Sequence, residues 1–221
     1  MGNGKCLPVS YLVPVLFPER RMDEANELTS RHRIDYTGAK MGMWIFLFTE
    51  VLFFGGMFLL YSVFRAKYAL EFHTSAAELD LFLGTANTAL LLTSSMSMAF
   101  SIALIRKGEK GLSLLCQALT IALGIIFLVN KYVEWGVHIQ SGIYPDSPAL
   151  LEMSRGKIIF FSLYYVMTGL HGLHVLIGVF VIGGTLLFTV RGIIHRSDFV
   201  KLENTGLYWH FVDVIWIYLF P

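Results

Sequence analysis

Five ionisable residues lie inside long apolar segments of the chain, where charged side chains are costly. They are Glu50, His171, His174, His210 and Asp213. His171 and His174 are three positions apart, as are His210 and Asp213, so in a helix each pair shares one face. Carboxyl and imidazole groups can exchange hydrogen bonds, relay protons or bind metal ions. Because such groups face the interior of a helix bundle, we predict that these five meet there.

A further polar pair, Lys131 and Glu134, also has a spacing of three residues. It lies near the predicted outer end of the third apolar segment. A helix-end ion pair, with the lysine extending toward the lipid headgroups, is the simplest interpretation.

The surrounding sequence is typical of a membrane protein. It is 55% hydrophobic and 15% charged, against about 25% charged residues in a soluble domain. Five apolar segments cover residues 41–64, 79–105, 112–132, 157–190 and 204–221. A helix needs about 20 residues to cross the hydrocarbon layer, so the first four are long enough and the fifth is marginal. We therefore predict an all-α integral membrane protein in which a polar segment, residues 1–40, precedes a five-transmembrane-helix bundle, residues 41–221.

The distribution of lysine and arginine predicts the orientation of the bundle. Twelve of these residues fall on the side of the N-terminal segment and four on the other, with Lys131 uncounted inside the third span. Positive charge concentrates on the cytoplasmic side. The N-terminus is therefore predicted to be cytoplasmic and the C-terminus outside. The twelve residues are Lys5, Arg20, Arg21, Arg31, Arg33, Lys40, Arg106, Lys107, Lys110, Arg191, Arg196 and Lys201, and the four are Arg65, Lys67, Arg155 and Lys157.

Four interpretations of the buried polar residues remain open from the residues alone. They are hydrogen bonds that fix helix register, a lipid-headgroup or proton-relay site, a haem or metal site, and a transport pathway. A di-metal bundle site repeats Glu-x-x-His on two helices, which this sequence does not, and a haem with two histidine ligands has only His210 as its second histidine. Interrupted helices of the transporter type are also missing. A net charge of +1 gives no basis for nucleic-acid binding.

Three strings around these residues resemble cytochrome c oxidase subunit III. They are FTEVLFFG at 48–55, TGLHGLHVLIG at 168–178 and YWHFVDVIW at 208–216. A weaker match is KYVEW at 131–135. The strings occur in the order of the family, and the resemblance covers roughly residue 38 to the end of the chain.

The resemblance implies a place in a haem-copper terminal oxidase, which reduces O₂ to water and pumps protons. Haem and copper belong to the other core subunits, so this chain is expected to bind no metal and to have no catalytic activity alone. It is expected to pack mainly against subunit I, to contact subunit II, to hold phospholipid, and to support proton uptake and turnover lifetime. The implied location is the bacterial inner membrane, crossed several times.

Within that resemblance, Glu50 matches the family's buried glutamate, and the other four residues match its interior polar positions. We expect Glu50 to hydrogen bond to His174, His210 or Asp213, and to be protonated or to share a proton. No member of this set is expected to be a catalytic or metal-binding residue.

The sequence also departs from the pattern of many family members, which have seven spans. The two N-terminal helices that form one arm of a lipid-holding cleft are missing, and small subunits are the expected substitute. Five-span versions occur in cytochrome c and quinol oxidases, so the electron donor stays open. The alternatives are an accessory subunit of a nitric oxide reductase and a stand-alone membrane enzyme or transporter.

Overall fold

The computed structural model describes residues 18–145 and 147–220, with side chains described for 37–145, 147, 148 and 150–220. In these ranges the regular structure is helical, apart from one isolated bridge between His195 and Asp198. Residues 1–17 of the predicted polar segment, and Pro221 at the predicted end of the fifth span, lie outside the described residues. The chain divides into two compact units, residues 1–42 and 43–221. All side chains of the candidate site belong to the second unit.

The part of the chain that the structure describes contains five long helices: α2 (Pro18–Lys67), α4 (Leu81–Lys107), α5 (Lys110–Gln140), α7 (Arg155–Val190) and α8 (Val200–Leu219). Four stretches within the described residues are long and apolar enough to cross a membrane, namely Thr37–Lys67, Leu81–Lys107, Lys110–Gln140 and Arg155–Val190. Helix α8 is not among them, because its turns carry several polar and charged residues. These stretches support an all-α membrane bundle with at least four candidate spans.

The observed helices differ from the predicted spans at several of their ends, most of all in α2 and α5. Helix α2 begins at Pro18, so the charged stretch before the first span is helical and continuous with it. Helix α5 continues to Gln140, eight residues beyond the predicted end at 132, so Lys131 and Glu134 lie well inside it. Two short helices, α3 (Ala69–Ala77) and α6 (Pro148–Leu151), were not predicted.

Local sequence explains where helix α4 starts and stops. The side chain of Asp80 accepts hydrogen bonds from the backbone N–H groups of Phe82 and Leu83, at 2.9 and 3.1 Å, and so caps the first turn. Gly108 ends the helix with φ of 89°, a left-handed conformation that glycine adopts without steric cost. The chain then reverses directly into α5, which makes α4 and α5 antiparallel neighbours.

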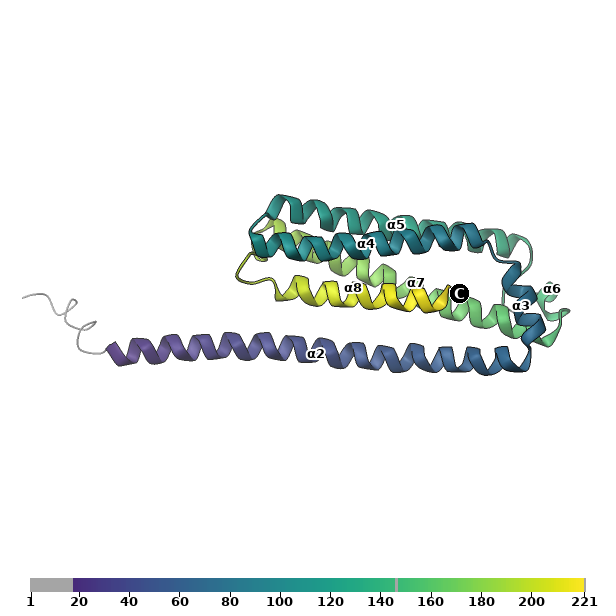
Figure 1. Cartoon of the computed structure of the whole chain (residues 1–221), viewed down its shortest axis with the longest axis horizontal. Coiled ribbons are helices and arrows are strands. Elements are labelled where there is room, and N and C mark those ends of the chain that lie inside the picture. Colours follow the sequence, from purple (N-terminus) through teal and green to yellow (C-terminus); the bar gives the residue numbers. More distant parts are fainter. Residues whose placement is uncertain (1–17, 146, 221) are drawn as a thin grey trace, which may run out of the picture. The chain divides into compact units, whose positions relative to one another are not determined.

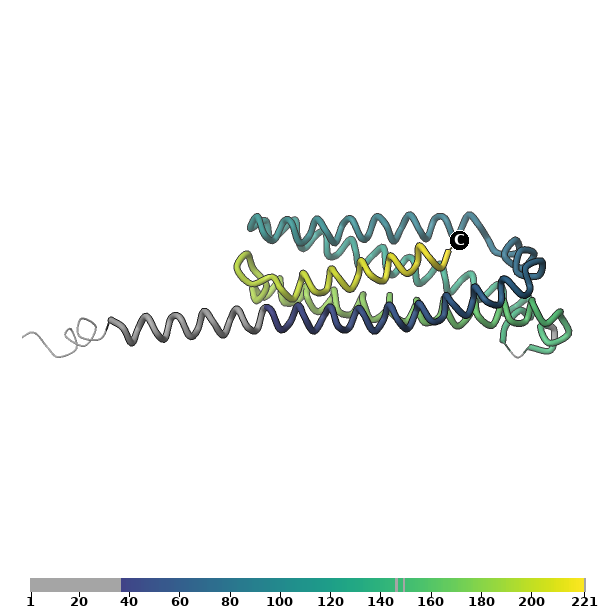
Figure 2. The backbone as a smooth tube through the Cα atoms, turned by 60° about the horizontal axis from the view of Figure 1, so that its bottom comes forward, coloured from purple at the N-terminus to yellow at the C-terminus, as the bar shows by residue number. Residues whose placement is uncertain are grey.

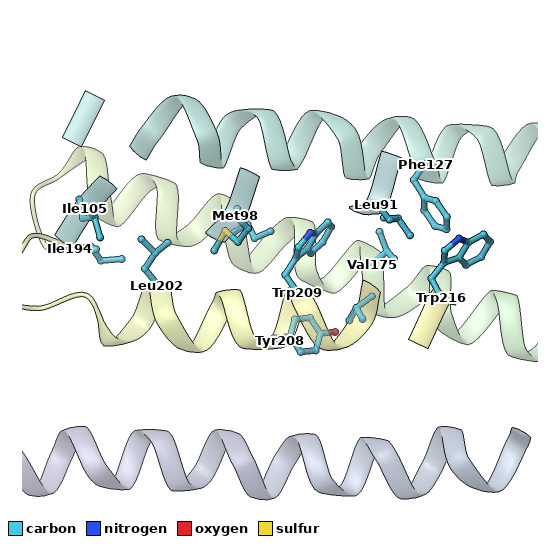
Figure 3. Packing of buried hydrophobic residues seen from close by; sticks show 12 residues of the cluster. Leu91, Met98, Ile105, Phe127, Val175, Ile194, Leu202, Tyr208, Trp209 and Trp216 are labelled. Atoms are coloured by element: carbon cyan, nitrogen blue, oxygen red, sulfur yellow. The ribbon is translucent and has the colours of Figure 1, made fainter. Parts of the chain in front are cut away.

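Helices α4, α5, α7 and α8 form a closed ring, in which α4 packs on α5, α5 on α7, α7 on α8 and α8 on α4 (Figures 1 and 2). Two buried indoles of α8, Trp209 and Trp216, fill its centre (Figure 3). Glycines admit the first of them: a Cβ at Gly178 or Gly124 would lie 2.7 or 2.9 Å from the Trp209 ring. Close packing around the two indole side chains fixes the register of the four helices.

Helix α2 is not part of this ring and contacts it through side chains. Only 11% of its most apolar 18-residue stretch is buried, against 28–33% in the other three candidate spans. Among its described side chains, residues 37–67, Leu47 and Phe54 are the buried apolar ones. Most of the apolar surface of α2 is therefore left to face lipid or another protein.

Candidate functional site

Glu50 and His174 form a polar contact between α2 and α7. The Nε2 atom of His174 lies 3.1 Å from a carboxyl oxygen of Glu50, and the two side chains are 13% and 19% exposed. Phe54, one turn further along α2, places its ring edge-on against the imidazole, with centroids 5.2 Å apart. Both side chains are therefore largely buried, with an aromatic ring beside the imidazole.

The second nitrogen of His174 determines how this pair holds its proton. Nδ1 lies 2.7 Å from the carbonyl oxygen of Leu170, a group that only accepts, so Nδ1 carries a hydrogen. A neutral His174 then has an unprotonated Nε2, which must accept a hydrogen bond from a protonated Glu50. The other possibility is an imidazolium that donates to a carboxylate. In both cases one proton lies between the two side chains, as an acid–base pair requires.

His210 and Asp213 lie on α8 where it packs against α4. Nδ1 of His210 is 2.5 Å from the hydroxyl oxygen of Ser95. Asp213 is 3% exposed, and its carboxyl oxygens form no hydrogen bond that meets normal geometry with the described residues. The Ser95 hydroxyl is nevertheless close enough to influence that carboxyl group. Ser95 is thus the polar neighbour common to both residues.

His171 is fully buried inside the ring of four helices. Its imidazole lies between the rings of Phe127 and Trp216, with centroids 5.6 and 5.1 Å away. Neither ring nitrogen has a hydrogen-bond partner among the described residues. His171 and His174 occupy one broad face of α7, yet the first points into the ring and the second toward α2.

Lys131 and Glu134 form a buried ion pair rather than a helix-end pair. The ammonium nitrogen lies 3.0 Å from each oxygen of Glu134, and the side chains are only 12% and 8% exposed. The hydroxyl of Tyr164 on α7 donates to Glu134, and Lys131 donates to the same hydroxyl at 3.2 Å. Lys131 also lies 5.1 Å from the centre of the Trp216 ring. The expected lysine extending toward headgroups is therefore wrong, because Tyr164 and Trp216 hold it inside.

The five predicted residues do not join in a single hydrogen-bonded cluster. The structure pairs Glu50 with His174 and His210 with Ser95, and leaves His171 and Asp213 without such a bond within the described chain. Sequence reasoning did not assign Tyr164 to the Lys131–Glu134 pair. A phenol facing the interior of an apolar span was the available signal, since buried tyrosine hydroxyls usually find a partner.

The described residues offer no obvious metal site. Among them, no three histidine, cysteine, aspartate or glutamate side chains are arranged so that they could hold a metal ion. Polar contacts across the helix interfaces are instead pairwise, as in the hydrogen bond of 2.9 Å that Asn130 donates to Asn87.

Known proteins similar to this chain identify its family. The profile of the family described as cytochrome c oxidase subunit III matches residues 12–221. A cytochrome c oxidase subunit 3 of Thermostichus vulcanus is 32% identical over 184 residues, covering 81% of this chain and 83% of that protein. One of Synechocystis sp. is 33% identical over 180 residues, covering 81% and 72%. A probable quinol oxidase subunit 3 of Staphylococcus haemolyticus is 32% identical over 184 residues, covering 82% and 85%.

The match extends over nearly the whole chain and over most of each relative, and it includes the helices that carry Glu50, His174 and Asp213. Together with several apolar helices, it makes the chain a multi-pass protein of the bacterial membrane. The chain belongs to the cytochrome c oxidase subunit III family and has the role of subunit III in a haem-copper oxidase.

Proposed function

We propose that this subunit crosses the membrane five times, with residues 1–40 as a cytoplasmic segment, residues 41–221 as the membrane domain and the C-terminus outside. Helix α8 is the fifth span, because its 20 residues extend about 30 Å and it lies between α4 and α7 in the ring. The excess of lysine and arginine on the N-terminal side supports this orientation. A reporter enzyme that works only outside the cytoplasm, fused to the C-terminus, tests it: an inactive reporter on a stable fusion protein would refute the orientation.

In the oxidase, the subunit supports the catalytic core without catalysing a step itself. It packs mainly against subunit I, also contacts subunit II, and holds phospholipid, while haem and copper reside in those partner subunits. Small subunits take the place of the two additional helices of longer family members. The exposed apolar surface of α2 supports a role in contacting lipid or a partner. The electron donor is either cytochrome c or a quinol, since relatives of both kinds match the chain.

The observation that carries the functional proposal is the contact of 3.1 Å between Glu50 and His174. This contact joins α2 to α7 in the least buried part of the bundle. It has two possible roles in the oxidase, which differ in what they require of Glu50. As a helix tether, the contact needs only a hydrogen bond. As a proton reservoir for the neighbouring subunit, it needs a group that gains and loses a proton.

Two substitutions of Glu50 separate these roles in the purified oxidase. Glu50→Gln retains a hydrogen bond, because its amide can donate to Nε2 of His174, but it cannot release a proton. Glu50→Leu removes both capacities. If the contact is only a tether, Glu50→Gln preserves the proton-uptake rate, the number of turnovers before inactivation and the phospholipid content, and Glu50→Leu lowers the latter two.

A proton reservoir requires slower proton uptake in both variants. Unchanged uptake in Glu50→Gln would therefore exclude the reservoir. Wild-type lifetime and lipid content in Glu50→Leu would exclude the tether. His195→Gln is a suitable control, because His195 is exposed and lies in the α7–α8 connection, away from this pair.

A further inference from the structure

His171 places two unsatisfied polar atoms inside the ring of four helices. The residue is 0% exposed, and both imidazole nitrogens have no partner among the residues that the structure describes. A neutral imidazole always has one N–H donor and one nitrogen acceptor, whichever tautomer is present. Buried polar atoms in folded proteins are nearly always hydrogen bonded, to protein or to ordered water. A partner that both donates and accepts is therefore needed here.

The side chains that surround His171 cannot be that partner. Phe127 and Trp216 contact it with their rings, and the indole N–H of Trp216 already donates to the hydroxyl of Thr88, at 3.0 Å. Lys131, whose nitrogen lies 5.1 Å from the centre of the same indole, directs its hydrogens to Glu134 and Tyr164. Contact with an aromatic ring is at most a weak substitute for a hydrogen bond to an imidazole nitrogen.

A second unsatisfied group lies in the same layer of the ring. Asn87, which precedes Thr88 on α4, is fully buried and accepts a hydrogen bond from Asn130 through its carbonyl oxygen. Its own amide nitrogen has no partner among the described residues. At the level of Trp216, the Asn87 amide therefore needs a hydrogen-bond acceptor. The two nitrogens of His171 need one donor and one acceptor.

We propose that water molecules bind inside the ring at His171, in the layer that contains Trp216 and Asn87. Water suits this layer because it donates and accepts at once, and buried waters typically make about three hydrogen bonds to such groups. A bound cation does not suit it, since a cation could serve the imidazole acceptor but not its N–H. This hydrated layer is separate from the Glu50–His174 pair, which faces α2.

Radiolytic hydroxyl-radical labelling of the intact oxidase tests the proposal, because radicals formed from bound water modify the side chains beside it. The chain supplies matched controls. His174 has partners for both nitrogens and is more exposed than His171, at 13%. Phe54 and Phe127 are equally buried, at 1% and 0%, and each lies edge-on to one of the two histidines.

Access from bulk solvent predicts that His174 is modified at least as fast as His171. Bound water predicts the reverse order, with His171 and Phe127 modified severalfold faster than His174 and Phe54. Equal or slower modification of His171 and Phe127 would overturn the proposal.

A His171→Phe variant provides a second test. It should reduce the modification of Phe127 to the rate of Phe54, because it removes both water-binding nitrogens, and persistence of fast Phe127 labelling would count against water held by His171. If this variant does not assemble with its partners, the comparison within the wild-type oxidase still decides the question. A density map of that oxidase at a resolution that shows water should contain a peak within hydrogen-bond distance of a His171 nitrogen.

Discussion

Replacing Lys131 by methionine should destabilise the subunit strongly, because it leaves Glu134 charged and buried. Methionine keeps most of the apolar stem of the lysine and removes only its charge and its hydrogen bonds. The change therefore separates the ionic contribution of the side chain from its packing. It also leaves Tyr164 in place to donate to Glu134.

The magnitude follows from the burial of the pair. The ammonium group makes two contacts of 3.0 Å with Glu134, whose side chain is 8% exposed. Removing one partner of a buried ion pair costs about 3–5 kcal/mol of unfolding free energy, since the other charge remains without compensation. Loss of the contact with the Trp216 ring, 5.1 Å from the ammonium, adds about 0.5–2 kcal/mol. The retained Tyr164 bond opposes these losses, so we expect a decrease of about 3–5 kcal/mol in total.

Unfolding in mixed micelles with increasing SDS, followed by circular dichroism, measures this decrease. The double variant Lys131→Met/Glu134→Gln should recover most of it, because glutamine is neutral and its carbonyl oxygen can still accept from Tyr164. Lys157→Met is the matched control: Lys157 pairs with Glu78 at 2.6 Å, but the two side chains are 28% and 41% exposed, so its loss should cost at most about 1 kcal/mol. If Lys131→Met is no more destabilising than Lys157→Met, the inference from burial is incorrect.

Two further substitutions test the packing and the polar contacts of the ring. Gly178→Ala should lower the unfolding free energy by about 1–3 kcal/mol, because the new Cβ would lie 2.7 Å from the Trp209 ring. Gly183→Ala, with nothing within 4 Å of its Cβ, should leave the same SDS midpoint unchanged or raised. Asn130→Leu should cost about 1–3 kcal/mol, since it leaves the buried carbonyl of Asn87 without a donor. For Gly178→Ala and Asn130→Leu, heating should release the subunit from the oxidase at a lower temperature than in the wild type.

The sequence predicted most of the helices, because apolar segments of membrane length leave few alternatives. It predicted poorly where those helices end. The continuation of α5 to Gln140 is one example: the polar residues after position 132 resemble a helix end, but Glu134 is satisfied by Lys131 and Tyr164 inside the bundle. Helical periodicity cannot reveal a partner on another helix. Helices α3 and α6 were not predicted because each is too short to show a clear helical pattern of apolar residues.

The sequence predicted which residues make up the candidate site, but not which of them form hydrogen bonds with each other. Spacing correctly placed His171 and His174 on one broad face of α7. A face of that width contacts two neighbours, however, and a difference of three residues turns one side chain toward Phe127 in the ring and the other toward Glu50 on α2. Which carboxyl group meets which imidazole is decided by the packing of the helices. The large side chains of α8 govern that packing, and Trp209 in particular requires glycine on α5 and α7.

In this bundle, the helix with the longer apolar stretch is the less buried one. In the apolar stretch of α2 that is described, residues 37–67, only Leu47 and Phe54 are buried among the large apolar side chains, and most of the others are exposed. Helix α8 has no stretch apolar enough to count as a candidate span, yet it packs against α4 and α7, with Glu203 and Asp213 both buried. The reason is physical: a helix that faces lipid must be apolar, whereas a helix enclosed by protein can carry polar groups that find partners there. A span that fails a hydropathy criterion is therefore expected at the centre of such a bundle, and its polar residues mark the interface where function should be tested first.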